Sequence, residues 1–359
     1  MKNTAMIVGA SGLSGSNLAR HLQEVGDWKV YGLSRSGAAV SGVDEMVKLD
    51  LTNREAAMTK LGRLRDVSHV YFCTWSRQET EAENCIVNRA MVKNALDGLS
   101  CSRLRHVALV TGTKHYLGPF DAYAQGRPYT PFQEDQPRLP GQNFYYEQED
   151  EVFEAAKTRG FTWSVHRPHT MIGYTLGNAM NMAVTLAVYA TICRATGRPF
   201  LFPGSAAQYE AVTDITDARL LAEHLHWAGT CSRAANTAFN IVNGDLFRWH
   251  RMWRDIGNWF GLEPAEFPGH PTPLEKQMQN APVLWASIAK QYKLAEPDVA
   301  KLVSWWHSDA DLGREIECFN DMRNSRNAGF LSCQDSRHSF FDVFDRLVAE
   351  NIIPYPKIM

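Results

Sequence analysis

The first half of the chain alternates between short apolar runs and longer amphipathic stretches. The runs are almost continuously apolar, which is typical of strands that are buried on both faces of a parallel sheet. They predict strands at residues 4–8, 28–33, 45–51, 67–74, 104–111 and 162–167. The stretches between them predict helices at residues 16–22, 53–64, 81–99 and 144–158. Strands that alternate with helices predict an α/β fold, a Rossmann-type doubly wound parallel sheet.

The second half of the chain is less regular. We expect strands at 209–212 and 238–242, and helices at 180–196, 217–228, 247–260 and near 297–307 and 337–350. A proline-rich loop covers 264–273, and the stretch 117–143 is long enough to indicate a functional loop or lid. These patterns predict a dinucleotide-binding domain over 1–168, to whose sheet 208–243 return, and a smaller, mainly helical substrate-binding lobe formed by 169–207 and 244–359.

Composition excludes several classes of partner. The formal net charge is -2, so we expect no nucleic-acid partner, because nucleic-acid binders usually carry a basic stripe. No run reaches the roughly 18 apolar residues of a membrane span, and no secretion signal is evident at the start. The 7 cysteines are scattered without a C-x-x-C pair, which favours reduced thiols in a cytoplasmic protein and no metal site. The sequence does not decide whether the protein forms a homodimer.

A glycine-rich turn follows the first predicted strand and precedes a helix. Gly9 permits a tight turn, Gly12 lets the backbone approach a pyrophosphate, and Gly15 allows the helix to pack on the strand. Ser11 and Leu13 lie in the same turn. Strand, turn and helix in this order predict a dinucleotide site at a helix N-terminus.

The end of the second predicted strand indicates which dinucleotide binds. It reads Ser34-Arg35-Ser36 and lacks the carboxylate that would hold a ribose 2′-hydroxyl. Arg35 can pair with a 2′-phosphate instead, which predicts NADP. Asp50 and Leu51, after the third strand, are expected near the adenine, although Asp50 could equally cap the following helix.

The catalytic residues do not follow the usual Y-x-x-x-K spacing of short-chain dehydrogenases, because the residue four positions after Tyr145 is Glu149. Lys114 lies instead just after the strand at 104–111, at the carboxyl end of the sheet, where the cofactor crevice is expected. A lysine from a different element could therefore replace the helical lysine. His115, His166 and His169 are expected to be packing histidines, and Asp217 is expected to cap a helix.

Several segments resemble the progesterone 5β-reductase/iridoid synthase-like family, atypical extended short-chain dehydrogenases. They are CTWSRQETEAEN (73–84), TGTKHYLGPF (111–120), NFYYEQED (143–150) and WSVHRP (163–168), with further likeness at 180–193, 212–224 and 238–249. The resemblance covers nearly the whole chain. It departs at Arg35, where plant members commonly have paired arginines, and at 167–173, where the family often has Gly-Asn after the proline.

The resemblance implies that Lys114 and Tyr145 form the active pair and that Phe120 lines the substrate pocket. Tyr146 and Phe340 are further candidates for that pocket, and Tyr146 is the alternative catalytic tyrosine. The remaining expected contacts of the cofactor, beside the pair itself, are Thr74, Trp75, Thr111, Pro168 and Met171.

The reaction implied is NADPH-dependent 1,4-reduction of the C=C bond of an enone, in which a phenol hydrogen-bonded to the carbonyl oxygen stabilises the enolate. We expect the Lys114 cation to favour phenolate character in Tyr145. The tryptophans at 249, 253, 259, 305 and 306 suggest a small apolar substrate. Alternatives are a carbonyl reductase or sugar-nucleotide epimerase of the same fold, and an NADP-sensing module without catalysis.

Overall fold

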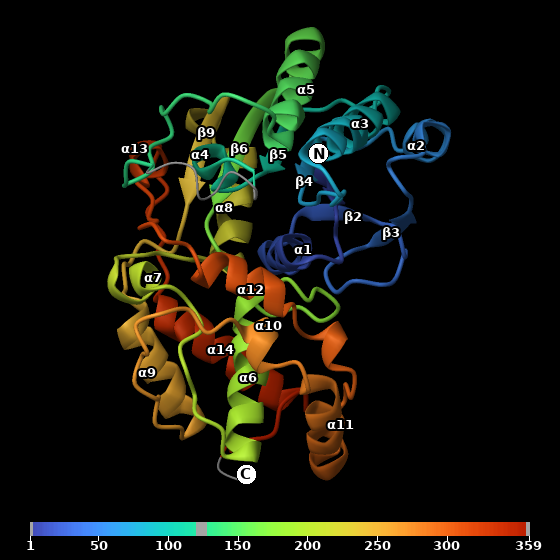
Figure 1. Cartoon of the computed structure of the whole chain (residues 1–359). Coiled ribbons are helices and arrows are strands. Elements are labelled where there is room, and N and C mark those ends of the chain that lie inside the picture. Colours follow the sequence, from blue (N-terminus) through green and yellow to red (C-terminus); the bar gives the residue numbers. More distant parts are fainter. Residues whose placement is uncertain (1–2, 120–127, 357–359) are drawn as a thin grey trace.

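The computed structural model describes residues 3–119 and 128–356, and a parallel sheet forms the upper part of the molecule in Figure 1. Its 7 strands lie in the order β3-β2-β1-β4-β5-β6-β9. All neighbours in the sheet pair in parallel. The strands are β1 (Asn3–Val8), β2 (Trp28–Ser34), β3 (Glu45–Lys48), β4 (His69–Phe72), β5 (His106–Val110), β6 (Thr162–Pro168) and β9 (Thr237–Ile241). The predicted Rossmann-type architecture is confirmed.

Alternate side chains of each strand enter two apolar layers, because successive residues of a strand point to opposite faces. In β1, Met6 and Val8 join the layer beneath α2 (Arg54–Leu61), α3 (Glu81–Gly98) and α5 (Phe144–Arg159). Ala5 and Ile7 join the opposite layer, beneath α1 (Leu13–Val25) and α8 (Ala218–Thr230). The sheet is therefore covered on both faces, which explains why its strands read as continuous apolar runs.

The order in which strands are added to the sheet reverses between β1 and β4, while all strands stay parallel. Strands β1 to β3 extend one way, and β4 then pairs with the free side of β1. In such sheets a ligand binds at the carboxyl ends of the strands where the order reverses. The loops that follow β1 and β4 lie close together at this point, since a Cβ on Gly9 would lie 2.6 Å from Cβ of Thr74.

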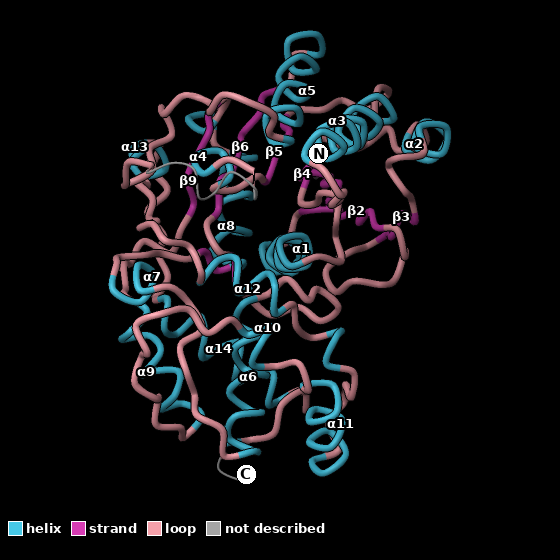
Figure 2. Tube along the Cα trace, viewed as in Figure 1, coloured by secondary structure: helices cyan, strands magenta, loops and turns pink. Residues whose placement is uncertain are grey.

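The lower part of the molecule is mainly helical, and Figure 2 shows strands gathered almost wholly in the upper part. Its centre is α6 (Met182–Thr196), whose residues are buried continuously from Met182 to Cys193, as expected of a helix packed on all sides. Around α6 lie helices that share one apolar core: α9 (Trp249–Phe260), α10 (Leu274–Gln277), α11 (Ala281–Tyr292), α12 (Trp305–Leu312) and α14 (Ser336–Ala349).

The remaining elements are short. They are α4 (Lys114–Leu117), α7 (Ala206–Glu210), α13 (Arg323–Asn327), the 3₁₀ turns η1 (Ser232–Ala234) and η2 (Val299–Lys301), and a small parallel pair, β7 (Met171–Ile172) with β8 (Thr216–Asp217).

Two predictions in the second half were wrong in detail. The strand expected at 209–212 is absent, because Ser205 caps α7 by accepting a hydrogen bond from the Gln208 N–H at 3.1 Å, and Tyr209 lies in that helix. Of the segment 208–243, only β9 enters the main sheet, whereas β8 pairs with β7. The helix α8 between them packs against α1, and Asp217 caps it as predicted.

All cysteines lie within the described residues and are free thiols. Burial raises the pKa of Cys73 to about 12, so this thiol holds its proton at neutral pH. Among the described residues, no helix combines the length and the apolar composition that crossing a membrane requires.

Candidate active site

A pocket of about 450 Å³, here called the central pocket, opens where the carboxyl ends of β1, β2, β4, β5 and β6 meet. It is lined by nearly all the residues expected to bind a cofactor. These are Gly9, Ser11, Gly12, Leu13, Ser34, Arg35, Asp50, Leu51, Thr74, Trp75, Thr111, Lys114, Tyr145, Pro168 and Met171. Gly15 and Ser36 do not line it.

The glycine turn brings backbone N–H groups to one end of the pocket. Gly12 caps α1 without any side-chain hydrogen bond, so the N–H groups of the first turn are open to an anion. Gly15 acts through packing, because a Cβ there would lie only 2.3 Å from the Gly9 carbonyl oxygen. This turn therefore offers the positive end of a helix dipole to a phosphate group.

The adjacent end of the pocket contains Arg35, whose side chain is exposed. Ser34 and Ser36 shape the turn around it: the Ser34 hydroxyl accepts a hydrogen bond from the Gly37 N–H at 3.0 Å, and the two hydroxyls lie 3.4 Å apart. Asp50 does not cap α2. Its carboxylate accepts hydrogen bonds from the backbone and hydroxyl of Thr52, which lower its pKa.

Lys114 lies at the start of α4, directly after β5, and its side chain is only 6% exposed. The ammonium group lies 3.2 Å from Oε2 of Glu81 and 4.5 Å above the centre of the Phe144 ring. It is 5.9 Å from the centre of the Tyr145 ring. The structure therefore brings together the lysine and the tyrosine that the sequence placed on different elements.

Glu81 was missed by the sequence reasoning. Its Oε1 also accepts a hydrogen bond from the Phe144 N–H at 3.0 Å, so one carboxylate joins α3, α4 and the start of α5. Asn143 adds a second tie, since its amide donates to the Lys114 carbonyl at 2.9 Å and its oxygen accepts from the Tyr145 N–H. The sequence did hold a signal for Glu81: Thr80 and Glu83 form a capping box, which puts Glu81 in the first turn of α3.

The expected phenolate character of Tyr145 was wrong. Burial raises the pKa of this phenol, and the negative charge of Glu81 raises it further. Glu81 also lies against the Lys114 ammonium, at 3.2 Å. Tyr145 is therefore a neutral phenol, able to donate a hydrogen bond. Its hydroxyl lies close to Gly112, where a Cβ would be 3.3 Å away, and both residues line the pocket.

Tyr146 and Phe340, two of the three residues predicted to line the substrate pocket, do not line the central pocket. The Tyr146 hydroxyl donates to the His115 carbonyl at 2.8 Å and accepts from the Leu139 N–H, so it is committed to packing. Phe340 is fully buried in the core around α6, where it packs against Trp249, because its helix turns that face inward. Phe120 lies outside the described residues.

The pocket wall formed by the segment after β6 and by α12 was also not foreseen. Of the five tryptophans expected to make the site apolar, only Trp306 lines it, whereas Trp249 and Trp253 are buried in the core. The wall contains polar side chains from Thr170, Asn178, His307 and Asp311, beside Gly177 and the apolar Met180. No spacing in the sequence signals this wall, because it joins segments far apart in the chain.

The histidines expected to serve packing are buried and hydrogen-bonded. His166 bonds to His224 at 2.8 Å and to Ser164 at 2.7 Å, and Ser164 bonds in turn to His106 at 2.8 Å. Burial lowers the pKa of His106 and of His224 to about 3.

His169 lies between Asp214 and Arg314, at 2.6 and 2.8 Å. None of the residues in these two groups lines the central pocket.

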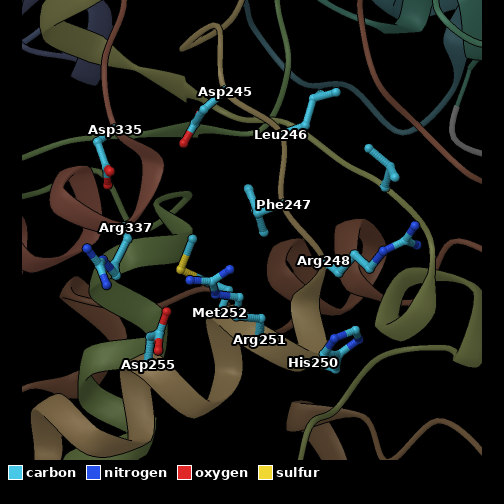
Figure 3. A pocket seen from close by; sticks show the side chains of 11 residues that line it. Asp245, Leu246, Phe247, Arg248, His250, Arg251, Met252, Asp255, Asp335 and Arg337 are labelled. Carbon is cyan, nitrogen blue, oxygen red and sulfur yellow. The ribbon is translucent and has the colours of Figure 1, made fainter.

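A second pocket, of about 490 Å³, lies between the start of α9 and the start of α14 (Figure 3). Its charged groups are mixed in sign, with Asp245, Asp255 and Asp335 beside Arg248, Arg251, His250 and Arg337. None of the residues predicted for catalysis or cofactor binding lines it. The predicted catalytic pair and most of the predicted cofactor residues are therefore gathered in the central pocket instead.

The sheet order and the pocket at its reversal define a protein of the extended short-chain dehydrogenase/reductase architecture. UDP-N-acetylglucosamine 4-epimerase from Bacillus cereus superposes with a TM-score of 0.66 at 13% identity, over 96% of this chain and 99% of that one. A short-chain dehydrogenase/reductase superfamily protein from Agrobacterium tumefaciens, solved with bound NAD, superposes with a TM-score of 0.63 at 14% identity, over 97% and 99%. At such identities the likeness concerns the fold.

The sequence itself assigns the family. The PRISE-like Rossmann-fold domain matches residues 24–354. The chain is 38% identical over 366 residues to (S)-8-oxocitronellyl enol synthase from Camptotheca acuminata, over 98% of this chain and 94% of the relative. It is 38% identical over 364 residues to 3-oxo-Delta(4,5)-steroid 5-beta-reductase from Arabidopsis thaliana, with the same coverage. The chain belongs to the PRISE-like family, which confirms the predicted resemblance.

Proposed function

We propose that this protein is an NADPH-dependent enone reductase that adds hydride to the β-carbon of an activated C=C bond. The observation that carries the proposal is the neutral phenol of Tyr145 in the central pocket, beside Lys114 paired with Glu81. Relatives named as a steroid 5-beta-reductase and as enol synthases support an oxidoreductase acting on conjugated carbonyl compounds.

The residues of the pocket fit a nicotinamide dinucleotide phosphate. The open first turn of α1 suits the pyrophosphate. A side chain on Gly9 would collide with Thr74, so only a glycine fits this tight turn beside the loop after β4. Arg35 supplies the cation for a 2′-phosphate. The end of β2 carries no carboxylate that would repel this phosphate, because Asp50 follows β3 and not β2. Lys114 and Tyr145 would lie at the nicotinamide end.

Bound NADPH supplies a hydride from the nicotinamide ring. As hydride reaches the β-carbon, negative charge grows on the carbonyl oxygen, and the Tyr145 hydroxyl donates a hydrogen bond to it. This bond strengthens as the charge develops, so it lowers the barrier more than it stabilises the bound substrate. A phenol whose pKa is raised keeps its proton and leaves the product as an enolate, which takes a proton at the α-carbon from water.

Lys114 acts by position and charge. Its ammonium is held against Glu81 and over the Phe144 ring, so its flexible stem is fixed before a ligand binds. We infer that it orients the nicotinamide ribose and that its charge, partly balanced by Glu81, adds to the stabilisation of the enolate oxygen.

The test mixes the protein, NADPH and 2-cyclohexenone and identifies the product. The saturated ketone is expected, and formation of the allylic alcohol alone would refute the 1,4 assignment in favour of a carbonyl reductase. Tyr145→Phe should lower kcat by about 10²–10³, the usual loss for one oxyanion donor. The hydroxyl makes no hydrogen bond within the described chain, so the midpoint of unfolding should not change.

Tyr146→Phe is the matched control, because the neighbouring phenol bonds only to backbone groups. It should cost stability, about 1 kcal/mol for a lost hydrogen bond, and leave the chemistry intact. A larger loss of kcat in Tyr146→Phe than in Tyr145→Phe would transfer the catalytic role to the other tyrosine. A cytoplasmic homodimer remains a prediction, which size-exclusion chromatography with light scattering and cell fractionation would test.

A further inference from the structure

The segment directly after β6 contains a strained residue in the wall of the central pocket. Thr170 has a φ of +25°, and among the residues that the structure describes it is the only β-branched one with a positive φ. A branched Cβ makes this conformation costly, so it persists only where surrounding contacts impose it. Pro168, Thr170 and Met171 all line the pocket. The contacts that hold Thr170 therefore also shape the pocket wall.

The Tyr145 hydroxyl borders the same part of the pocket. A Cβ placed on Gly112 would lie 3.3 Å from this hydroxyl and 3.4 Å from the Pro168 carbonyl oxygen. The end of β6 and the phenol thus face one small space. A displacement of the segment after β6 would move one side of the space in which, under the proposed function, the nicotinamide ring meets the substrate.

The Arg314 guanidinium holds Thr170 from behind the wall. Its Nη2 donates a hydrogen bond to the Thr170 hydroxyl at 3.2 Å, and its Nε donates to the Asp311 carbonyl oxygen at 2.8 Å. The Thr170 hydroxyl donates in turn to the Asp311 carboxylate at 3.0 Å. Because Arg314 is buried and does not line the pocket, one planar side chain ties the segment after β6 to α12 from inside the protein.

His169 fixes the orientation of that guanidinium. Its Nε2 lies 2.8 Å from Nη1 of Arg314, and its Nδ1 lies 2.6 Å from a carboxylate oxygen of Asp214. A guanidinium offers only donors, so Nε2 accepts, and the ring proton is assigned to Nδ1, which donates it to Asp214. Asp214 also accepts a hydrogen bond from the Asn320 backbone N–H at 2.6 Å. Each nitrogen of the imidazole therefore has one fixed partner.

We propose that Arg314 and His169 are positioning residues: their hydrogen bonds hold the segment 168–171 in its strained conformation and so align the nicotinamide ring with the substrate carbon that accepts the hydride. Neither residue lines the central pocket, so both act through Thr170. The inference rests on the proposed function and adds to it the part of the chain that sets the geometry of hydride transfer. Small displacements of reacting groups lower the rate steeply, even where binding is retained.

Three variants test the two residues. Arg314→Lys keeps the positive charge but cannot bond to His169, Thr170 and Asp311 at once. His169→Gln keeps an oxygen that can accept from Arg314 near the position of Nε2. His169→Asn is too short for that contact and can replace only the donor to Asp214.

Arg194→Lys is the matched control for the loss of a hydrogen-bonded arginine. The Arg194 guanidinium donates to the carbonyl oxygens of Phe260 and Gly261 at 2.6 and 2.8 Å, and it does not line the central pocket. This variant should lower stability in urea and leave kcat unchanged.

The kinetic readout is kcat for 2-cyclohexenone at saturating NADPH. It should fall about 10- to 100-fold in Arg314→Lys and in His169→Asn, the cost of misplacing the reacting groups, and His169→Gln should restore most of it. The dissociation constant of NADPH, measured by fluorescence titration, should change little in all three variants, because the phosphate groups would bind at the glycine turn and at Arg35.

A structural readout is independent of activity. Crystal structures of the wild type and of Arg314→Lys should show Thr170 at a positive φ in the first and relaxed to a negative φ in the second. Should Arg314→Lys not fold, the same comparison is made between His169→Gln and His169→Asn.

An unchanged kcat in Arg314→Lys, equal kcat values in the two His169 variants, or a Thr170 that keeps its positive φ without the Arg314 contact would overturn the inference and leave the proposed function standing. A wild type that reduces no enone would overturn the proposed function, and with it the alignment of hydride transfer. The crystal structures would then still decide whether Arg314 and His169 hold the segment.

Discussion

Replacing Glu81 by Gln tests the electrostatic design of the site most directly, since it removes one charge and keeps the shape of the side chain. The carboxylate holds the Lys114 ammonium at 3.2 Å, and the two side chains are only 12% and 6% exposed. With an effective dielectric constant of about 20, Coulomb's law gives an attraction of about 5 kcal/mol at this separation. Removing one partner of a buried pair typically costs about 3–5 kcal/mol, because the other charge loses its counter-ion.

We therefore expect Glu81→Gln to lower the free energy of unfolding by about 3 kcal/mol. Denaturation in urea, followed by fluorescence and analysed by linear extrapolation, measures this change. Glu79→Gln is the control, because this exposed carboxylate precedes the same helix, and it should change stability by less than about 0.5 kcal/mol. A loss below about 1 kcal/mol in Glu81→Gln would refute the reasoning, since Lys114 would then be hydrated in solution.

The same substitution also changes the titration of Tyr145. The Glu81 charge raises the pKa of this phenol, so its removal should lower that pKa. Enone reduction, which needs the protonated hydroxyl, should then fall off at a lower pH in Glu81→Gln than in the wild type. A pH profile of kcat that extends above the ordinary phenol pKa of about 10 measures the difference, and an unmoved alkaline limb would show that Glu81 does not act on the phenol.

Three further outcomes are expected. Arg35→Ala should raise KM for NADPH about 10- to 100-fold, the worth of a charge-assisted hydrogen bond, and leave KM for NADH unchanged; equal changes for both would exclude a 2′-phosphate contact. Gly15→Ala should destabilise the fold by at least about 2 kcal/mol in urea denaturation, because its Cβ would lie 2.3 Å from a backbone oxygen, whereas Gly12→Ala, with 3.4 Å, should affect cofactor affinity alone. His106 and His224 bind fewer protons in the folded chain than in the unfolded one between about pH 3 and 6.5. The free energy of unfolding should therefore fall as the pH is lowered through this range. Urea denaturation at about pH 7, 6, 5 and 4 measures this change, and a flat profile would contradict the lowered pKa values of the two histidines.

The sequence by itself predicted most elements of the sheet and the glycine turn of the central pocket. Continuous apolar runs marked the buried strands, and the glycines between β1 and α1 marked the turn that brings backbone N–H groups to the pocket. These signals are local: the burial period of a strand, the conformational freedom of Gly9 at φ +86°, and the cap at Asp217 each depend on a few neighbouring residues. The segment at 209–212 failed as a strand for the same reason, since Ser205 offered a local helix cap that outweighed a short apolar run.

Only the tertiary structure decided the electrostatics of the central pocket and the residues that form its walls. Glu81 and Lys114 are 33 residues apart in the chain, and burial together with the Glu81 charge raises the pKa of the Tyr145 phenol, which Lys114 was expected to lower. The polar wall of α12 and the burial of Phe340 in the helical core likewise follow from packing between distant segments. A pKa and the lining of a pocket depend on distance and burial in space, which residue patterns along the chain do not encode.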